Sequence, residues 1–392
     1  MKIGIILNSA PYFGGTFQYN ETILEALNYI KNNEEKVDVV AAYDDVLWRK
    51  YLKRYDFKLL KTNLRINKAY IQNINIDELR KVLPDMHIGA KDMLKEKCDI
   101  WICPSQDVWS FLLDAPVLST IHDLMHRYEK DFPEVCDDGE YEYRELLYSN
   151  MCKYSKGILV DSKCGKNQVI ESYNINSEKI NILPFIAPKY IFDCTNVIDV
   201  RKKYNIKGKY IFYPAQFWEH KNHINLVKAI NIVSKVETDI KLVFSGSTKY
   251  SGYGKVLNII RKYNLEKNVI FLGYVSEEEI VNLYKESEML VMPTFFGPTN
   301  IPPLEAMALK CPMALSDVYG MREQSGKAAL YFNPNIPDEI AQCILKILKD
   351  SDIRNKLIEN CEIELEKHSC ENFYKKLYTI IKKMIIKKSK DE

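Results

Sequence analysis

The sequence predicts an α/β protein made of two doubly wound domains, each with a Rossmann-like parallel sheet. Short apolar runs of strand length alternate with amphipathic segments of helix length along the whole chain, which is typical of parallel α/β layers. At 392 residues the chain is also long enough for two domains of ordinary size. We place these domains at residues 1–190 and 191–370, followed by a basic helix at 371–392.

The expected elements follow the chain in two series. Strands of the first series are expected at 2–8, 37–43, 99–104, 116–122, 157–162 and 180–185. Strands of the second are expected at 209–215, 240–246, 269–275, 289–295, 312–317 and 329–334. Helices are expected at 16–33, 223–236, 256–264 and 276–287, and Ser276 with Glu279 forms a capping box at the start of the last one. Residues 184–208 contain two prolines and no strand pattern, so we expect the domains to join there.

The composition excludes several classes of protein. Apolar content of 46% and charged content of 28% are typical of a soluble globular chain, and a net charge of +2 argues against a general nucleic-acid binder. No run of 18 apolar residues and no leader pattern is present, so we expect neither a membrane span nor a signal peptide. Ten scattered cysteines without a C-x-x-C pair indicate reduced thiols in a cytosolic protein, and their spacing argues against structural zinc.

Ligands of doubly wound sheets bind beyond the carboxyl ends of the strands, so residues that follow strands are the candidates. Gly14 and Gly15 follow the first strand. Their backbone can approach a ligand closely, and the next helix start offers N–H groups to a phosphate or a sugar hydroxyl. The pattern is not G-x-G-x-x-G, which gives a nicotinamide or flavin site little support. The alternative is an ordinary loop.

His122 ends the strand at 116–122 and is followed by Asp123, His126 and Arg127. Such a histidine can hydrogen-bond a substrate hydroxyl or polarise a departing group. A buried structural histidine is the alternative, and the charged neighbours favour a site. No serine-centred elbow and no Cys–His signature accompanies it, so a hydrolytic triad is not supported.

Lys221 stands between a strand and a helix, where its compact charge suits a diphosphate; the alternative is a solvated lysine. Pro302 and Pro303 mark a helix start, and we expect Glu305 in the first turn of that helix. Glu305 can accept hydrogen bonds from two vicinal hydroxyls, such as those of a ribose, or simply complement the helix dipole. Donors to a phosphate are expected just before it, at Thr299, Asn300 and Ile301.

Together these residues carry a resemblance. The strand, loop and helix around Lys221, followed by residues 293–317, resemble glycosyltransferase family 4, whose members are retaining, nucleotide-sugar-dependent enzymes of GT-B fold. Residues 157–184 and 269–293 support it. The resemblance implies two facing Rossmann-like domains with an interdomain cleft. It further implies transfer of a hexose, mannose by preference, from a GDP- or UDP-sugar to a glycan or lipid-linked glycan in bacterial surface polysaccharide synthesis.

The same resemblance assigns roles to the candidates. Glu305 would hold the donor ribose, Lys221 would bind the diphosphate, and His122 would lie near the transferred sugar, which makes these three the catalytic set. Gly14 and Gly15 would lie beside donor and acceptor. The remaining donor-binding positions would be Gln216, Tyr274, Val275, Thr299, Asn300 and Ile301, with the base packed on Tyr274 and Val275. The acceptor side would include Asp123, His126 and Arg127.

No bound cofactor and no metal is implied, and the single Asp-x-Asp, at Asp350 and Asp352, lies between two expected helices. Two positions depart from the family pattern: Gly297 replaces the first glutamate of its motif, and Gln216 stands where many members have an arginine. The alternatives are a nucleotide-sugar epimerase of the same fold, or a non-catalytic scaffold that binds a nucleotide sugar or another glycosyltransferase of the pathway.

Residues 373–390 form a basic amphipathic segment with an apolar face. That face consists of Phe373, Leu377, Ile380, Ile381, Met384 and Ile385. It can contact a membrane surface, or pack across the domain join with its lysines in solvent, and the two can coexist. A second basic group could also contact the membrane: Lys61, Arg65, Lys68 and Arg80. We therefore expect a cytoplasmic protein, with peripheral contact at the inner face of the cytoplasmic membrane as an option.

Overall fold

The computed structural model describes residues 1–11, 14–67, 71–72, 74–250 and 252–386, and within them the chain forms two compact units. Unit 1 consists of residues 1–127, 138–185 and those from Cys370 onward, and unit 2 consists of residues 128–137 and 186–369. The change of unit after residue 185 lies in the segment where a join was expected. The short segment 128–137, by contrast, packs with unit 2 although it lies within the first series of elements.

Unit 1 contains a parallel sheet of seven strands within the described chain, in the order β3-β2-β1-β4-β5-β6-β7. The strands are β1 (Lys2–Leu7), β2 (Asp38–Tyr43), β3 (Lys58–Lys61), β4 (Ile100–Cys103), β5 (Val117–Thr120), β6 (Gly157–Val160) and β7 (Ile180–Ile182). Six of them confirm the predicted strands. Edge strand β3 was missed, because its four residues carry a lysine at each end and none of them is fully buried.

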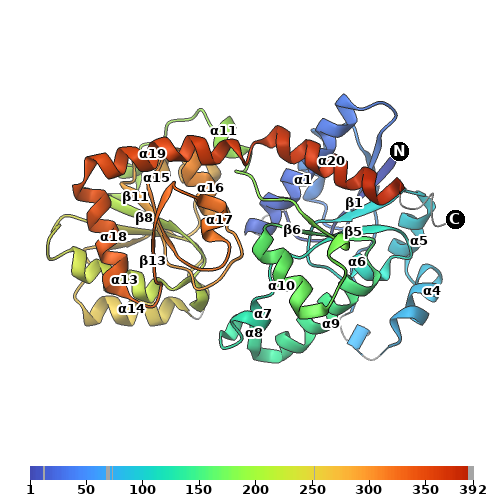
Figure 1. Ribbon diagram of the computed structural model, residues 1–392, viewed down its shortest axis with the longest axis horizontal. Helices are drawn as coiled ribbons and strands as arrows, with labels where there is room; N and C mark the ends of the chain where they lie inside the picture. The colour runs from blue at the N-terminus through green and yellow to red at the C-terminus, as the bar shows by residue number, and fades with distance from the viewer. Residues whose placement is uncertain (12–13, 68–70, 73, 251, 387–392) are drawn as a thin grey trace. The chain divides into compact units, whose positions relative to one another are not determined.

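Helices cover the sheet of unit 1, and α1 runs beside the last helix of the chain (Figure 1). They are α1 (Gly14–Asn33), α2 (Trp48–Leu52), α4 (Ile76–Met86), α5 (Ile88–Lys95), α6 (Trp109–Leu112), α7 (Met125–Tyr128, which ends in unit 2), α9 (Glu140–Tyr154), α10 (Lys163–Tyr173) and α20 (Cys370–Ile386). Strands β4, β5 and β6 are buried along their whole length, as expected when helices cover both faces of a parallel sheet.

Unit 2 contains a second parallel sheet, of six strands in its described residues, in the order β10-β9-β8-β11-β12-β13. The strands are β8 (Tyr210–Pro214), β9 (Lys241–Ser245), β10 (Val269–Phe271), β11 (Met289–Met292), β12 (Met313–Ser316) and β13 (Ala329–Phe332). All six were predicted. The strand order places β8 and β11 at the centre of the sheet, so the loops that follow them lie side by side at its carboxyl edge.

The helices of unit 2 lie on both faces of its sheet, with α13 and α14 on one side and α15 and α16 on the other (Figure 1). They are α8 (Pro133–Cys136), α11 (Tyr190–Asp193), α12 (Val200–Tyr204), α13 (His223–Val233), α14 (Gly252–Lys262), α15 (Glu277–Glu286), α16 (Ile301–Ala308), α17 (Met321–Ser325), α18 (Pro337–Lys349) and α19 (Ser351–Glu366). The predicted capping box of α15 is present. Together with the parallel sheets, these layers confirm the predicted fold class of two Rossmann-like α/β domains.

One predicted position within a helix is corrected. Helix α16 begins at Ile301, so both prolines lie in its first turn, as predicted, but Glu305 is its fifth residue and lies in the second turn. Prolines are tolerated at the second and third positions of the helix because the N–H group that proline lacks would have no partner within the helix there. Glu305 is therefore held by side chains, which are described below, rather than by free N–H groups of the first turn.

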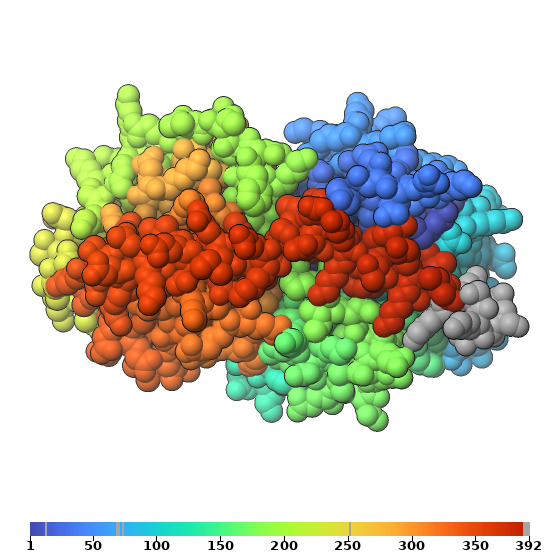
Figure 2. Space-filling model, turned by 45° about the horizontal axis from the view of Figure 1, so that its top comes forward, coloured from blue at the N-terminus to red at the C-terminus, as the bar shows by residue number. Residues whose placement is uncertain are grey.

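Helix α20 belongs to unit 1, where it contacts α1 and β4. Figure 2 shows it beside the N-terminal part of that unit. Five of the six residues of its predicted apolar face are buried, and the Met384 sulfur lies close to Gly157 of β6. The apolar face is thus used inside unit 1, which leaves the lysines exposed. Packing across the domain join stays a prediction, and residues 387–390 of the predicted segment lie outside the described residues.

Candidate functional site

The loops that follow β8, β9 and β10 in unit 2 are tied together by hydrogen bonds. Gln216, two residues beyond β8, accepts a hydrogen bond from the backbone N–H of Ser247 through Oε1 at 2.7 Å. The N–H of Gly246, which follows β9, donates to the carbonyl of Gly273 at 2.8 Å. The amide oxygen of Gln216 is therefore bonded to the loop after β9. Its predicted role in binding the sugar donor stays a prediction.

The turn that carries Lys221 is held by its backbone. It is a 3₁₀ turn over Glu219–Lys221, and Asn222 follows in the left-handed conformation, which asparagine tolerates better than most residues. The carbonyl of His220 accepts from the N–H of Phe295 at 2.8 Å, and the carbonyl of Lys221 accepts from the hydroxyl of Tyr213 at 3.0 Å. The lysine thus lies between β8 and α13, as predicted, on a turn fixed at several points.

Lys221 and Asn300 meet at the start of α16. The ammonium Nζ of Lys221 lies 3.4 Å from Oδ1 of Asn300. The backbone of Asn300 is in turn paired with the amide of Gln324: its N–H donates to Oε1 at 3.0 Å, and its carbonyl accepts from Nε2 at 2.7 Å. This two-way pairing fixes the residue that precedes α16 and faces the lysine. The structure therefore brings two of the predicted donor-binding residues together.

Gly297 occupies a position that accepts no side chain without rearrangement. Its φ is +135°, a conformation that side-chain-bearing residues rarely adopt, and a Cβ atom added there would meet Nδ2 of Asn300 at 2.3 Å. The side chain of Asn300 therefore fills the space that a glutamate at 297 would need. The glycine that replaces the glutamate of the family motif at 297 is therefore accompanied by an asparagine side chain in the same space.

Glu305 is buried and held by two tyrosine hydroxyls. Tyr190, at the start of α11, donates to its Oε1 at 2.5 Å, and Tyr284 of α15 donates to its Oε2 at 2.9 Å. Burial raises the pKa of Glu305, while the two hydroxyls act in the opposite direction. Each carboxylate oxygen has a further lone pair, so both can still accept from a ligand. Sequence reasoning missed the tyrosines, because the one at 190 is 115 residues away in the chain.

The segment 128–137 reaches the same turn of unit 2 through Glu134. One oxygen of its carboxylate, Oε1, accepts from the backbone N–H of Glu219 and lies 3.4 Å from Nδ1 of His220. A second anchor joins Glu129 to the hydroxyl of Tyr319 at 2.5 Å. These contacts place a carboxylate directly behind the turn that carries Lys221. No local pattern at Glu134 could have indicated a partner 85 residues away.

The other predicted donor-binding residues of unit 2 differ in exposure. Tyr274 is 80% exposed, whereas its neighbour Val275 is buried. Thr299 is half-buried, and Ile301 is half-buried at the first position of α16. An exposed aromatic ring next to a buried aliphatic residue suits the packing of a planar base, and this role stays a prediction.

Two predicted groups lie in unit 1. Gly14 has φ +49°, is exposed together with Gly15, and begins α1. His122 follows β5, with its ring edge-on to Tyr19 at a centroid distance of 4.9 Å. Its Nε2 lies 2.9 Å from the carbonyl of Pro104 and therefore carries the proton. Burial lowers the pKa of His122, so the ring is neutral near pH 7 and its Nδ1 can accept a hydrogen bond.

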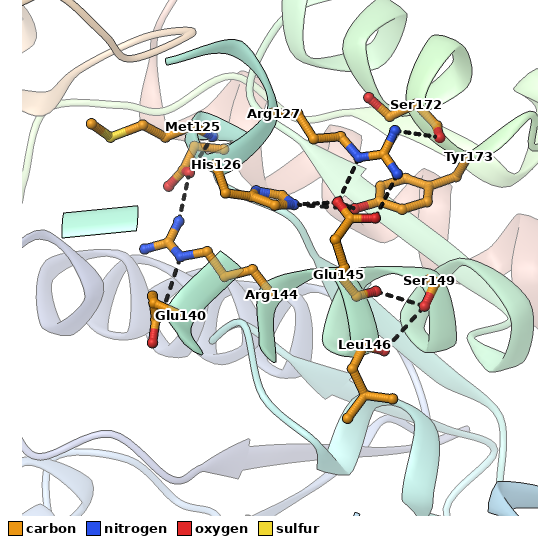
Figure 3. A network of polar contacts seen from close by, with 11 residues as sticks. Met125, His126, Arg127, Glu140, Arg144, Glu145, Leu146, Ser149, Ser172 and Tyr173 are labelled. Carbon is orange, nitrogen blue, oxygen red and sulfur yellow. Dashed lines mark hydrogen bonds and ion pairs between the residues drawn. The ribbon is translucent and has the colours of Figure 1, made fainter. Parts of the chain in front are cut away.

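Two of the three residues expected on the acceptor side, His126 and Arg127, lie in a polar network (Figure 3). Nε2 of His126 lies 2.7 Å from Oε1 of Glu145, and Arg127 binds both oxygens of the same carboxylate. Asp123 pairs with Arg144 at 3.2 Å. The side chain of His126 is fully buried, and its predicted role toward an acceptor stays a prediction. For Asp123 and Arg127 the predicted role stays a prediction.

Other predicted features have structural uses. Asp350 caps α19 by accepting from the N–H of Asp352 and of Ile353, at 3.1 and 3.0 Å. Among the described residues, no group of three or more His, Cys, Asp or Glu side chains could hold a metal ion. In the described part of the chain, no helix has both the length and the apolar character needed to cross a bilayer.

The predicted basic group is partly neutralised by carboxylates. Arg65 pairs with Asp44 at 2.9 Å, and Arg80 pairs with Asp114 at 2.8 Å. Lys61 is exposed, and Lys68 lies outside the described residues. Contact of this group with a membrane stays a prediction.

The chain was compared with known proteins. Residues 197–363 match the family model described as Glycosyl transferases group 1. This part of the chain is similar to the glycosyl transferases group 1 family. It contains Lys221, Asn300 and Glu305, so the predicted resemblance is confirmed where the donor-binding candidates lie.

Relatives of this glycosyltransferase-like chain include the O-antigen chain mannosyltransferase RfbU of Salmonella typhimurium, which is 29% identical over 216 residues. That match covers 55% of this chain and 56% of the relative, so the chain spans about half the length of the curated relative it matches.

Solved structures support the fold over nearly the whole chain. A glycosyltransferase from Rickettsia africae is 19% identical with a TM-score of 0.73, and the match covers 98% of each chain. Anabaena Alr3699/HepE in complex with UDP and glucose is 13% identical with a TM-score of 0.74, covering 98% of this chain and 100% of the other. The chain therefore has the GT-B fold.

Proposed function

We propose that the protein transfers a hexose, mannose by preference, from a nucleoside-diphosphate sugar to a glycan or lipid-linked glycan in bacterial surface polysaccharide synthesis. The observation that carries the proposal is the arrangement of Lys221, Asn300 and Glu305 at the strand ends of the part of the chain that is similar to the glycosyl transferases group 1 family. The name of the mannosyltransferase relative supports the choice of mannose. The base is guanine or uracil in this proposal.

The donor half of the reaction needs charge stabilisation more than a strong base. Lys221 is suited to the diphosphate, and the backbone N–H of Ile301, the first residue of α16, can donate a hydrogen bond to it as negative charge develops on the leaving group. Glu305 offers lone pairs to the two ribose hydroxyls, while its tyrosine partners keep the carboxylate oriented. Together these groups bind the leaving nucleotide at both of its polar parts.

The sugar half is assigned to His122 and the Gly14–Gly15 loop. Nε2 of His122 donates its proton to the carbonyl of Pro104. Nδ1 of the neutral ring can therefore accept a hydrogen bond from a sugar hydroxyl. The bond between the anomeric carbon and the diphosphate oxygen breaks, the acceptor oxygen bonds to the same face with retention of configuration, and its proton passes to the departing diphosphate. Positioning of the two reactants supplies much of the rate in such a scheme.

A non-catalytic scaffold that binds a nucleotide sugar is the second candidate. One observation favours it: Asn300 fills the space that the family's sugar-contacting glutamate would need at 297. An epimerase of the same fold would act on the nucleotide sugar without any acceptor. The two alternatives make different predictions in a turnover assay.

The first experiment is nucleotide binding, by thermal stabilisation and calorimetry with GDP, UDP, ADP and CMP. We expect one diphosphate nucleotide to bind and both Lys221→Ala and Glu305→Ala to weaken it by about tenfold or more, or ~1.4 kcal/mol each. The matched controls are Lys267→Ala and Glu266→Ala, two exposed positions of unit 2. Binding that ignores both site substitutions would overturn the donor assignment.

Turnover then separates the candidates. GDP-mannose and UDP-glucose are each incubated with and without a mannose-containing glycan, and the anomeric configuration of the product is read by NMR. Transfer with retention supports the proposal. Conversion of the donor without acceptor indicates an epimerase, and nucleotide binding without either reaction indicates a scaffold.

A further inference from the structure

A pocket of about 220 Å³ opens in unit 2 beside the turn that carries Lys221. Its lining includes Trp218 and Glu219 from that turn, and Asn222 directly after it. The lining also includes Phe295, which follows β11, and Phe132 of the segment 128–137. The pocket therefore shares a turn with the lysine proposed for the diphosphate.

Aromatic rings form part of the wall, and they hold one another in place. Phe132 and Phe295 stack at a centroid distance of 5.5 Å with their planes 28° apart. Phe217 stacks on His223 at 4.4 Å and 27°. Trp218 packs edge-on against Tyr250 at 5.5 Å. The rings therefore offer a preformed apolar surface rather than a set of mobile side chains.

Two buried polar atoms of the lining have no hydrogen-bond partner among the described residues. They are Nε1 of Trp218, which is a donor, and Nε2 of His223. His223 is 97% buried, and burial lowers its pKa to about 3, so the ring is neutral. Because its other nitrogen bonds the backbone of Ala215, Nε2 is an acceptor. Buried groups of this kind are rarely left unpaired, which points to a ligand that supplies both an acceptor and a donor.

We propose that this pocket binds one sugar ring of a glycan. A hexose has apolar C–H faces that pack on aromatic rings, and each hydroxyl can both accept from Trp218 and donate to His223. At the rim, Glu219 and Lys255 form an ion pair at 2.6 Å that can bond further hydroxyls. The volume is below that of sites for drug-sized ligands and suits a single ring.

The subsite rests on the proposed function, because a glycan acceptor or product would place sugar residues close to the diphosphate. It adds a specific position for one of them, in the nucleotide-binding unit. A flat aromatic ligand would also stack in this pocket, but it lacks the adjacent hydroxyls that satisfy both unpaired atoms. The test therefore includes such a ligand.

Trp218 supplies the signal for the test. The other three tryptophans of the chain, Trp48, Trp101 and Trp109, are at most 1% exposed, whereas Trp218 is half-buried. Acrylamide therefore quenches mainly Trp218. We expect methyl α-D-mannopyranoside, or a mannose disaccharide, to lower the quenching constant about twofold, because a stacked sugar covers the indole ring.

Two substitutions test the location. Ile224→Phe enlarges a half-buried lining residue and is expected to abolish the protection, whereas Ile363→Phe, on the exposed side of α19, is the matched control. Trp218→Phe removes the indole N–H and is expected to weaken sugar binding about fivefold in saturation-transfer NMR, the effect of one lost hydrogen bond.

The outcomes separate this proposal from the proposed function. Sugar protection that Ile224→Phe removes and Ile363→Phe leaves intact supports the subsite. Absence of protection by every sugar, protection that persists in Ile224→Phe, or binding of indole alone would overturn it. Nucleotide binding, measured on the same samples, is expected to persist in Ile224→Phe. If the wild type itself bound no nucleotide, the donor site of the proposed function would be contradicted, and not the sugar subsite.

Discussion

The carboxylate of Glu134 lies 3.4 Å from Nδ1 of His220, one residue before the lysine proposed for the diphosphate. It also accepts from the backbone N–H of Glu219, so a single side chain of the segment 128–137 holds the start of the turn. Burial alone would raise the pKa of Glu134, but the hydrogen bonds with His220 and the backbone keep it below its ordinary value. The turn is therefore held by a carboxylate that stays ionised.

The first prediction concerns this contact. Glu134→Gln should lower the free energy of unfolding by about 1–3 kcal/mol, because a charged hydrogen bond in a buried place is weakened. It should also lower the affinity for a nucleoside diphosphate about fivefold, or ~1 kcal/mol, because Lys221 loses part of its support. Urea denaturation and calorimetry measure the two effects, with exposed Glu142→Gln as the control. Unchanged affinity in a less stable variant would restrict Glu134 to a structural role.

The second prediction concerns pH and Glu305. Its pKa in the folded protein is raised above the ordinary 4.5, chiefly by burial. Its ionisation therefore costs stability as pH rises through this window, while ribose binding requires the ionised form. Nucleotide affinity should fall as pH decreases through the raised pKa, at a pH above the range of an ordinary glutamate.

The hydroxyl of Tyr284 lowers the pKa of Glu305, so Tyr284→Phe should move the midpoint of this pH dependence upward. Calorimetry between pH 4.5 and 8 in steps measures the midpoint. Glu305→Gln should bind weakly at every pH in this range. A Tyr284→Phe midpoint equal to that of the wild type would refute the assignment of the titration to Glu305.

The third prediction concerns Gly297. Gly297→Ala should destabilise unit 2 by about 1–3 kcal/mol, because φ +135° is strained for alanine and the Cβ atom meets Asn300. Adding Asn300→Ala to the Gly297→Ala variant should recover only the part of the lost stability that is due to the contact between the new Cβ atom and Asn300. The part due to the strained φ should remain. Gly254→Ala is the control: nothing lies within 4 Å of its added Cβ, and in helix α14 alanine should stabilise by up to about 1 kcal/mol. Equal stability of Gly297→Ala and the wild type in urea would contradict this account.

The fourth prediction concerns Glu279, the glutamate of the α15 capping box. Burial opposes its ionisation, but bonds from Lys203, Tyr204 and the backbone of Ser276 lower its pKa to about 2. Its folded pKa is thus below the ordinary 4.5, so its contribution to stability is complete above that pH and disappears as pH falls toward 2. Glu279→Gln should therefore be less stable than the wild type near pH 7 and almost equal to it near pH 2.

Denaturant midpoints measured at several pH values test this, with the exposed Glu266→Gln as the control. A difference between Glu279→Gln and the wild type that stays constant with pH would show that the charge of Glu279 contributes nothing to the cap.

Local patterns predicted much of the fold because each strand of a covered parallel sheet is a continuous apolar run. This is why twelve of the strands in the described residues were predicted, whereas β3, at a sheet edge with lysines at both ends, was missed. Lys221 was found for a similar reason, since a loop between a strand and a helix is a local feature. Glu305 was found, but its place in the helix was wrong by one turn.

The partners of these residues could not be predicted, because they come from distant parts of the chain. Tyr190 reaches Glu305 across 115 residues, and Gln324 pairs with Asn300 from another helix. A tyrosine or glutamine in an ordinary helix has no pattern that marks it as a partner. The contact between Gly297 and Asn300 could not be predicted either. The sequence shows that the glutamate is missing, but not that the side chain of Asn300 fills its place.

The return of α20 to unit 1 has a consequence for synthesis on the ribosome. Unit 1 needs residues 1–127, 138–185 and α20, and the whole main part of unit 2, residues 186–369, is translated before α20. Domains generally fold as units while the chain emerges, N-terminal parts first. Here unit 2 can be completed before unit 1. Until α20 has been translated, the side of α1 that α20 covers stays exposed. Nascent chains that end before residue 370 should therefore need chaperone protection of unit 1 rather than of unit 2.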